Sequence, residues 1–275
     1  MRMRGRKALQ EYLSMTRMEF KTVCRERRLC WGVVMLEHVT PMMVRTFARA
    51  GYEWLWIDNE HAHQSYESIY HAARTAEDVG IASIVRVTSD DYARIAQALD
   101  MAVTGIIVPR VETPEQVRHI VDCAKYPPVG KRGFGMRSGL FGAHKINMRD
   151  RAADQNETRF LAVQLESPRA VENIEKMIEV AEGQLDAIYY GPADFQMAIG
   201  APDCPDHPDV IAAARRITSV SAKHNLSNGT PAVSLETAKK WVDLGFNLVT
   251  YKSDDQFLAD AAYEGREQLR ALERG

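Results

Sequence analysis

Short apolar runs recur along most of this chain, and amphipathic stretches separate them. Alternation of buried strands with helices is typical of βα units and a parallel sheet. Eight such units in about 245 residues predict a single (β/α)8 barrel, also called a TIM barrel. The predicted strands are CWGVVML from Cys30, EWLWI from Glu53, SIVRV from Ser83, GIIVP from Gly105, FLAVQL from Phe160, AIYY from Ala187, SNGTPAV from Ser227 and NLVTY from Asn247.

Helix start and stop signals lie between these runs. Thr40, Thr113 and Ser167 each precede a proline, which predicts an N-cap followed by proline in the first helical turn. Left-handed positions just after helices are predicted at Gly51, Gly80, Gly183 and Gly245. These signals support alternating helices and strands along the whole chain.

The chain divides into a helical N-terminal segment, residues 1–28, and one barrel domain, residues 29–275. An open doubly wound sheet is the rival fold, but no glycine-rich phosphate loop follows the first strand. Over thirty residues between Tyr126 and Phe160 include a glycine-rich stretch without a clear strand. A loop of that length is usually functional or mobile, and we interpret it as an excursion that leads into strand five.

Composition limits the partners and the compartment. The 35 basic and 37 acidic residues nearly cancel, so no overall field attracts nucleic acid or an anionic membrane. The apolar runs fall far short of the roughly 20 residues of a membrane span, and no export signal is visible. Four cysteines without a C-x-x-C pair favour a reducing compartment. We therefore expect a soluble cytoplasmic protein.

Polar residues follow several predicted strands, at the barrel end where active sites lie. Glu166 and Asp194 come from neighbouring strand ends, and two carboxylates suit a hard cation such as Mg2+ or Mn2+. Either carboxylate could instead have a structural role, Glu166 by pairing with an arginine and Asp194 by capping the next turn. The pair predicts a metal site if the strand ends converge.

Other strand-end residues predict acid/base chemistry and anion binding. His61 is the natural general base, and Asp58, three residues earlier, could orient it. Arg86 lies on an apolar strand and must find an anion, which is either a structural acid or a substrate carboxylate. His61 and His63 form an H-x-H pair, a weaker indication of a metallohydrolase. Lys252 could in principle form a Schiff base, but most strand-end lysines extend to solvent.

At these strand ends the chain resembles the HpcH/HpaI aldolase family, which includes aldolases for 4-hydroxy-2-oxoheptanedioate and 2-keto-3-deoxy sugar acids. The resemblance runs from about Phe20 to about Leu272. Its motifs occur in order as D-x-E-H, V-R, P-x-V-x-[TN], Y-P-P-x-G-x-R-G, Q-[IL]-E and G-P-[AS]-D. Here they read DNEH from Asp58, VR at Arg86, PRVET from Pro109, YPPVGKRG from Tyr126, QLE from Gln164 and GPAD from Gly191.

The resemblance implies a metal-dependent class II aldolase that cleaves or forms a carbon–carbon bond between a pyruvate enolate and an aldehyde. It assigns the divalent metal, Mg2+ before Mn2+ or Co2+, to Glu166 and Asp194, and the acid/base unit to His61 with Asp58. Arg86 would bind pyruvate, and Gln164 would support the substrate. Backbone amides around Gly191 and Ala193 would meet the carboxylate.

The resemblance also implies a homo-oligomer, typically a hexamer, in which the last helix packs on a neighbour. Asp100 would enter the adjacent subunit's site. An oxaloacetate decarboxylase or an enolate-using synthase on the same metal platform is the rival activity. The chain departs from the family in GTPAV from Gly229 and TYKSD from Thr250, where family members read G-I-L and V-G-x-D. Lys252, in place of that glycine, is expected to add bulk and charge near the aldehyde pocket.

Overall fold

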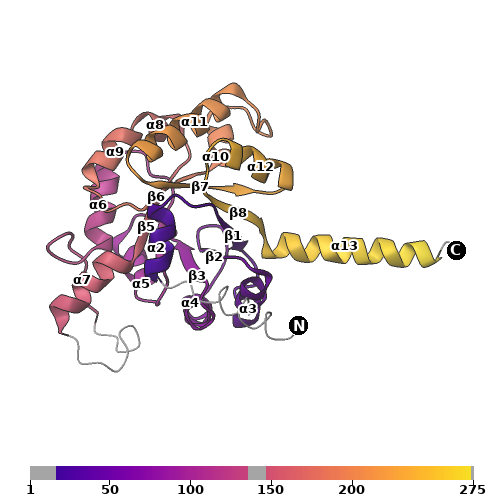
Figure 1. Ribbon diagram of the computed structural model, residues 1–275, viewed down its shortest axis with the longest axis horizontal. Helices are drawn as coiled ribbons and strands as arrows, with labels where there is room; N and C mark the ends of the chain where they lie inside the picture. The colour runs from indigo at the N-terminus through magenta and orange to yellow at the C-terminus, as the bar shows by residue number, and fades with distance from the viewer. Residues whose placement is uncertain (1–16, 136–146, 274–275) are drawn as a thin grey trace.

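Eight parallel strands form a closed barrel in sequence order, as predicted. The structure is a computed structural model, and it describes residues 17–135 and 147–273. Each predicted strand is present, so the (β/α)8 fold is confirmed (Figure 1). The strands are β1 (Cys30–Met35), β2 (Trp54–Asp58), β3 (Ala82–Arg86), β4 (Gly105–Val108), β5 (Phe160–Leu165), β6 (Ala187–Tyr190), β7 (Ser227–Ala232) and β8 (Leu248–Ser253).

Helices surround the barrel, and their ends carry the predicted caps. The side chains of Thr40, Thr113 and Ser167 accept hydrogen bonds from the backbone three residues later. The glycines predicted at left-handed positions, Gly51, Gly80, Gly183 and Gly245, all have positive φ. The helices are α2 (Arg17–Arg25), α3 (Pro41–Ala50), α4 (Tyr66–Val79), α5 (Tyr92–Leu99), α6 (Pro114–Ala124), α7 (Met148–Thr158), α8 (Pro168–Glu172), α9 (Ile174–Val180), α10 (Pro192–Ala198), α11 (Pro208–Lys223), α12 (Leu235–Asp243) and α13 (Asp254–Glu273).

Helix α2 covers the end of the barrel at which the strands begin. Phe20 is fully buried, and its ring contacts Trp54 of β2 and Phe160 of β5, which are the first residues of their strands. The described part of the N-terminal segment is therefore helical, and it shares a core with the barrel interior. Residues 1–16 of that segment lie outside the described residues. Because α2 covers this end, chemistry is restricted to the opposite end.

One helix was not expected from the sequence. Helix α7 forms within the stretch before β5, where no element was predicted, and Asn147 caps it by accepting from the N–H of Asp150. Its sequence is almost entirely polar, so it carries no apolar period to reveal it.

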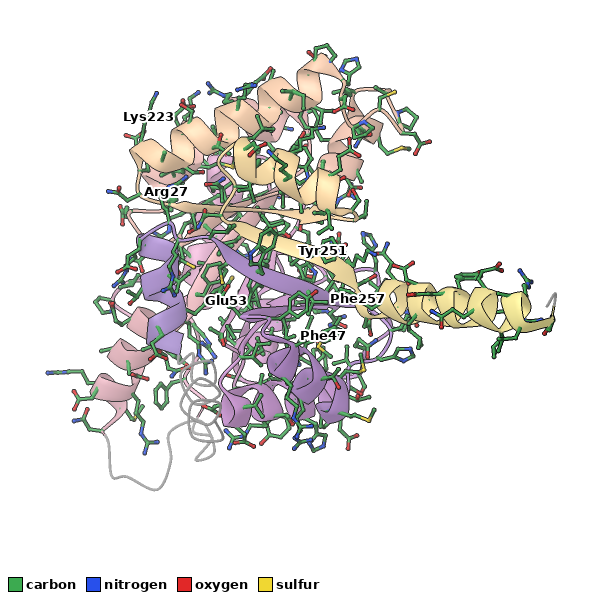
Figure 2. All side chains as sticks on the ribbon, turned by 45° about the vertical axis from the view of Figure 1, so that its right-hand side comes forward. Arg27, Phe47, Glu53, Lys223, Tyr251 and Phe257 are labelled. Carbon is green, nitrogen blue, oxygen red and sulfur yellow. The ribbon has the colours of Figure 1, made fainter. Side chains whose placement is uncertain are left out.

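Helix α13 extends away from the barrel (Figures 1 and 2). The first four residues of α13 are buried or half-buried. From Leu258 onward almost all of its residues are exposed.

The first turn of α13 is anchored by an aromatic cluster. Phe257 packs with Phe47 and Tyr52 from the α3 end and with Tyr251 of β8, at centroid distances of 5.9 to 6.1 Å (Figure 2).

Within residues 17–135 and 147–273, none of the helices is long and apolar enough to cross a membrane.

Candidate active site

The ends of β2, β3, β5 and β6 bring most of the predicted residues to one cavity. This cavity of about 190 Å3 is lined by His61, Arg86, Gln164, Gly191, Ala193 and Asp194, together with Val34, Trp56, Tyr189, Pro192, Pro231 and Thr250. A larger cavity of about 600 Å3 adjoins it, and Asp194 lines both. Glu166 lines the larger one, with Arg110 and Glu112. Both predicted carboxylates therefore line the larger cavity, and Asp194 also lines the smaller one.

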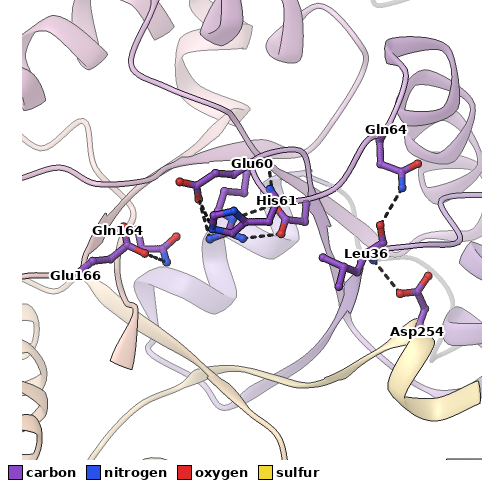
Figure 3. Close-up of polar contacts among 9 residues, drawn as sticks. Leu36, Glu60, His61, Gln64, Gln164, Glu166 and Asp254 are labelled. Carbon is purple, nitrogen blue, oxygen red and sulfur yellow. Dashed lines mark hydrogen bonds and ion pairs between the residues drawn. The ribbon is translucent and has the colours of Figure 1, made fainter. Parts of the chain in front are cut away.

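Glu166 is held by two donors in a buried position. Gln164 Nε2 donates to its Oε1 at 2.6 Å (Figure 3). The backbone N–H of Arg110 donates to its Oε2 at 2.9 Å. Burial raises the pKa of Glu166 to about 7, and the negative charges of Asp194 and Glu60 add to this effect. Burial and neighbouring negative charges disfavour the ionised form of this carboxyl group, so a positive charge placed beside it would stabilise that form.

Gly191 provides the space beside these groups. A Cβ at this position would lie 2.7 Å from Cγ of Glu166 and 2.9 Å from Nε2 of Gln164, so a side chain would displace them. The N–H of Gly191 donates to the carbonyl of Leu165 at 3.0 Å, and Pro192 has no N–H. The backbone donors left at the start of α10 are therefore those of Ala193 and Asp194.

The residues present fit a divalent cation. Asp194 lies in the first turn of α10, after the capping residue Gly191. The buried Oε1 of Gln164 has no hydrogen-bond partner among the described residues. Within those residues no group of three or more His, Cys, Asp or Glu side chains could hold a metal, so the protein would supply two carboxylates. Water and substrate oxygens would fill the other positions of an oxygen-liganded ion such as Mg2+.

Arg86 is the positively charged residue that lines the smaller cavity, and it pairs with the carboxylate that was expected to orient His61. Its Nε and NH2 donate to the two oxygens of Asp58, at 3.0 and 2.5 Å, and its NH1 lies 2.9 Å from Glu60 Oε2. Its guanidinium also lies over the ring of Trp56. Asp58 is thus paired with Arg86, and the contact it makes with His61 is to the backbone N–H, at 3.5 Å, rather than to the imidazole; its role in orienting His61 stays a prediction. Asp58 and Arg86 are directly opposite in the register of β2 and β3, which favours a two-point ion pair.

Glu60 is the acidic neighbour of His61, a role that the sequence did not reveal. His61 Nε2 lies 3.7 Å from Glu60 Oε2, and its side chain is 62% exposed. Burial raises the pKa of Glu60, and the charges of Arg86 and His61 oppose this effect. Glu60 directly precedes His61 in the D-x-E-H motif, so adjacency was the available signal. Trp56 and Tyr189 were also missed, although alternation along β2 and β6 places both inside the barrel.

Lys252 does not lie where it was expected. Its Nζ forms an ion pair with Asp260 of α13 at 2.6 Å, and it lies over the rings of Tyr251 and Phe257. It lines neither active-site cavity. The expected bulk and charge near an aldehyde pocket are therefore wrong. The backbone of Lys252 is left-handed, with a φ of 57°. In this conformation its side chain reaches Asp260 of α13.

Asp100 lies just after α5, near the end of the barrel at which the strands begin. Its carboxylate accepts from Arg132 NH2 at 2.5 Å, and it lines neither of the two cavities. A contribution of Asp100 to a site therefore requires another copy of the chain, and that expectation stays a prediction.

Comparison with known proteins identifies the family. The model of the HpcH/HpaI aldolase/citrate lyase family matches residues 33–261. The chain belongs to this family. The 2-keto-3-deoxy-L-rhamnonate aldolase of Salmonella typhi is 32% identical over 245 residues, which cover 88% of this chain and 89% of the relative. The predicted family and the predicted aldolase activity, that of a carbon–carbon lyase, are therefore confirmed.

Solved structures of similar proteins share the fold. The HpcH/HpaI aldolase from Desulfitobacterium hafniense DCB-2 superimposes with a TM-score of 0.84 at 25% identity, over 91% of this chain and 96% of that chain. Citrate synthase SbnG superimposes with a TM-score of 0.80 at 25% identity, over 93% and 98% of the two chains. One barrel type thus serves both an aldolase and a citrate synthase in proteins similar to this one.

Proposed function

We propose that this HpcH/HpaI aldolase binds pyruvate in the smaller cavity and cleaves or forms a 4-hydroxy-2-oxo acid there. The observation that carries the proposal is the placement of Arg86. Its guanidinium lines the same cavity as Asp194, beside Gln164 and the glycine that leaves room for substrate. A small 2-oxo acid has oxygens on adjacent carbons, so it can reach both the side of the cavity that carries Asp194 and the guanidinium of Arg86.

Glu166 and Asp194 would hold the divalent cation, Mg2+ before Mn2+ or Co2+. A cation bound there would supply Lewis acidity to the keto group and stabilise negative charge that develops during carbon–carbon cleavage. Arg86 would bind a pyruvate oxygen, and its ion pairs with Asp58 and Glu60 keep it in one orientation. The N–H groups of Ala193 and Asp194 would bind the pyruvate carboxylate.

His61 would move the proton at the C4 hydroxyl of the substrate, directly or through water. Its exposed imidazole borders the cavity, and an imidazole can both accept and donate a proton. Glu60 would orient it, in place of Asp58, because Glu60 is the carboxylate beside its Nε2. The H-x-H metallohydrolase stays the weaker alternative, since it would need further histidines at the ends of β5 and β6, where the chain has Glu166 and Asp194.

The direct test is pyruvate production from 2-keto-3-deoxy-L-rhamnonate and from a panel of other 2-keto-3-deoxy sugar acids. Removal of metal with EDTA should abolish the activity, and Mg2+ should restore it. Borohydride should trap no pyruvate adduct. Trapping on any lysine, or full activity without metal, would show that the proposal is wrong.

An enolate-using synthase or oxaloacetate decarboxylase is the second candidate, because citrate synthase SbnG shares the fold over nearly the whole chain. The same carboxylates and Arg86 would serve it. Turnover of oxaloacetate without an aldehyde, at a rate well above that for every sugar acid tested, would favour this activity.

We also propose a homo-oligomer, a hexamer by resemblance, in which α13 packs on a second copy. Large apolar side chains are exposed along α13 at Leu258, Tyr263, Leu269 and Leu272. A helix this exposed gains little stability alone and normally needs a packed face. An apolar cavity of about 310 Å3, lined by Trp31, Tyr52, Leu235, Ala238 and Tyr251 among others, lies open on the barrel side. These two features support exchange of α13 between copies.

A further inference from the structure

The loop that carries His61 is fixed at its two ends rather than through the imidazole. This loop, residues 59–65, joins β2 to α4. At its start, the N–H of Asn59 donates to the carbonyl of Arg86 at 3.1 Å, and Asp58 Oδ1 accepts from the backbone N–H groups of Glu60, at 2.9 Å, and His61, at 3.5 Å. Near its end, Gln64 Nε2 donates to the carbonyl of Leu36 at 2.9 Å. The imidazole itself has only the 3.7 Å contact with Glu60 among the described residues, so its position depends on these anchors.

The carbonyl that anchors Gln64 belongs to a segment that is fixed in turn. Leu36 follows β1, and its N–H donates to Asp254 Oδ1 at 2.8 Å. The same carboxylate accepts from the N–H groups of Glu37, at 3.2 Å, and His38. Asp254 is the first residue of α13 and is 1% exposed. A buried carboxylate that accepts three backbone hydrogen bonds holds those peptides firmly.

Hydrogen bonds therefore link three segments in series: the start of α13, the segment after β1 and the His61 loop (Figure 3). Leu36 joins them, since its N–H faces Asp254 and its carbonyl faces Gln64. We infer that Gln64 is a positioning residue for His61, and that Asp254 acts through Leu36 to hold Gln64 in place. This inference rests on the proposed role of His61 in proton transfer.

The expected effect is on the rate of cleavage rather than on pyruvate binding. Gln64 lines neither cavity, and Arg86 is fixed independently by Asp58 and Glu60. A displacement of about 1 Å in a reacting group can cost about 100-fold in rate. Loss of the Gln64 contact leaves the anchors at the start of the loop in place, so it is expected to have part of that effect, about 10-fold.

The variants are chosen to remove the donor with little change in volume. Gln64→Leu in the full-length protein should lower kcat for cleavage about 10-fold and change the pyruvate Kd less than twofold. Gln64→Lys, which restores an N–H donor, should recover part of the rate. Asp254→Asn should lower kcat in the same direction, and the double variant with Gln64→Leu should be no slower than Gln64→Leu alone. Asn156→Leu is the control and should keep the wild-type kcat. The Asn156 side chain holds another loop, donating to the carbonyl of Tyr126 at 2.9 Å and accepting from its N–H at 2.7 Å, and it lines neither active-site cavity.

The decisive comparison uses the His61→Ala background. If Gln64 acts through His61, Gln64→Leu should have no further effect there. An additive loss in that background, a wild-type kcat for Gln64→Leu, or a parallel loss of pyruvate binding would each overturn the inference while the proposed function stands. Near-normal cleavage by His61→Ala itself would instead contradict the proposed base, and the inference would fall with it.

Discussion

Binding of Mg2+ to this protein should depend on pH, because one proposed metal carboxylate is partly protonated near neutrality. Burial, the charge of Asp194 and the charge of Glu60 raise the pKa of Glu166 to about 7. A cation binds the ionised carboxylate, so it competes with a proton at this residue. Metal binding should therefore weaken as the pH falls below 7.

The pKa sets the size of the effect. With a value of about 7, Glu166 is ionised in roughly a tenth of the molecules at pH 6 and in roughly nine tenths at pH 8. The apparent Kd for Mg2+ should therefore be about tenfold lower at pH 8 than at pH 6, which corresponds to about 1.4 kcal/mol. Binding should release about 0.9 proton per cation at pH 6 and about 0.1 at pH 8.

Folding of the metal-free protein should show the opposite trend. The pKa of Glu166 rises from its ordinary 4.5 to about 7 in the folded state, so between these pH values the folded state holds a proton that the unfolded state has lost. The free energy of unfolding should therefore decrease as the pH rises through this window, by up to about 3 kcal/mol. Mg2+ above pH 7 should restore stability, because it binds only the folded state.

Isothermal titration calorimetry at pH 6, 7 and 8, in two buffers of different ionisation enthalpy, measures both the Kd and the protons released. Glu166→Gln should bind Mg2+ weakly and without this pH dependence. Glu112→Gln is the control, because Glu112 lines the same cavity but is hydrogen-bonded to Ser167. An equal Kd for the wild type at pH 6 and 8, or no proton release at pH 6, would refute the reasoning.

Three further predictions concern Arg86, His61 and α13. Arg86→Lys keeps one charge but loses the two-point contact with Asp58, so we expect kcat/KM for cleavage to fall about 100-fold in a folded protein; a wild-type rate would exclude Arg86 from pyruvate binding. His61→Ala should lower cleavage by about 100-fold to 10,000-fold while the pyruvate Kd, measured by calorimetry, changes less than twofold; if pyruvate binding is lost, His61 binds ligand instead. Deletion of residues 258–275 should reduce the assembly to smaller species in light scattering after size exclusion, and an unchanged mass would exclude α13 from the interface.

Local pattern was sufficient to predict the fold and the neighbourhood of the site. Runs of apolar residues identified β1 to β8, and a threonine or serine before proline identified three helix starts. These signals are local because burial and capping act over a few residues of the chain. Parallel strands in a barrel end on one side, so the order of the strands alone brought His61, Arg86 and Asp194 to one cavity.

Side-chain pairing could not be predicted from spacing. Asp58 is three residues from His61 in sequence, but the register of β2 and β3 places it opposite Arg86, and a guanidinium fork occupies both carboxylate oxygens. Glu60, assigned no role by the sequence, is the residue left beside the imidazole. Register depends on contacts between segments 28 residues apart, which no local pattern contains.

The sequence by itself therefore determined the eight βα units, their caps and the end of the barrel at which polar side chains collect. Only the tertiary structure decided which of those side chains contact one another and where the last helix lies. Lys252 and α13 illustrate the difference: the residue type suggested charge near the substrate, whereas the left-handed backbone and the ion pair with Asp260 direct the side chain along α13. Periodicity records which residues are buried, but the direction of a side chain depends on the partners that distant segments bring to it.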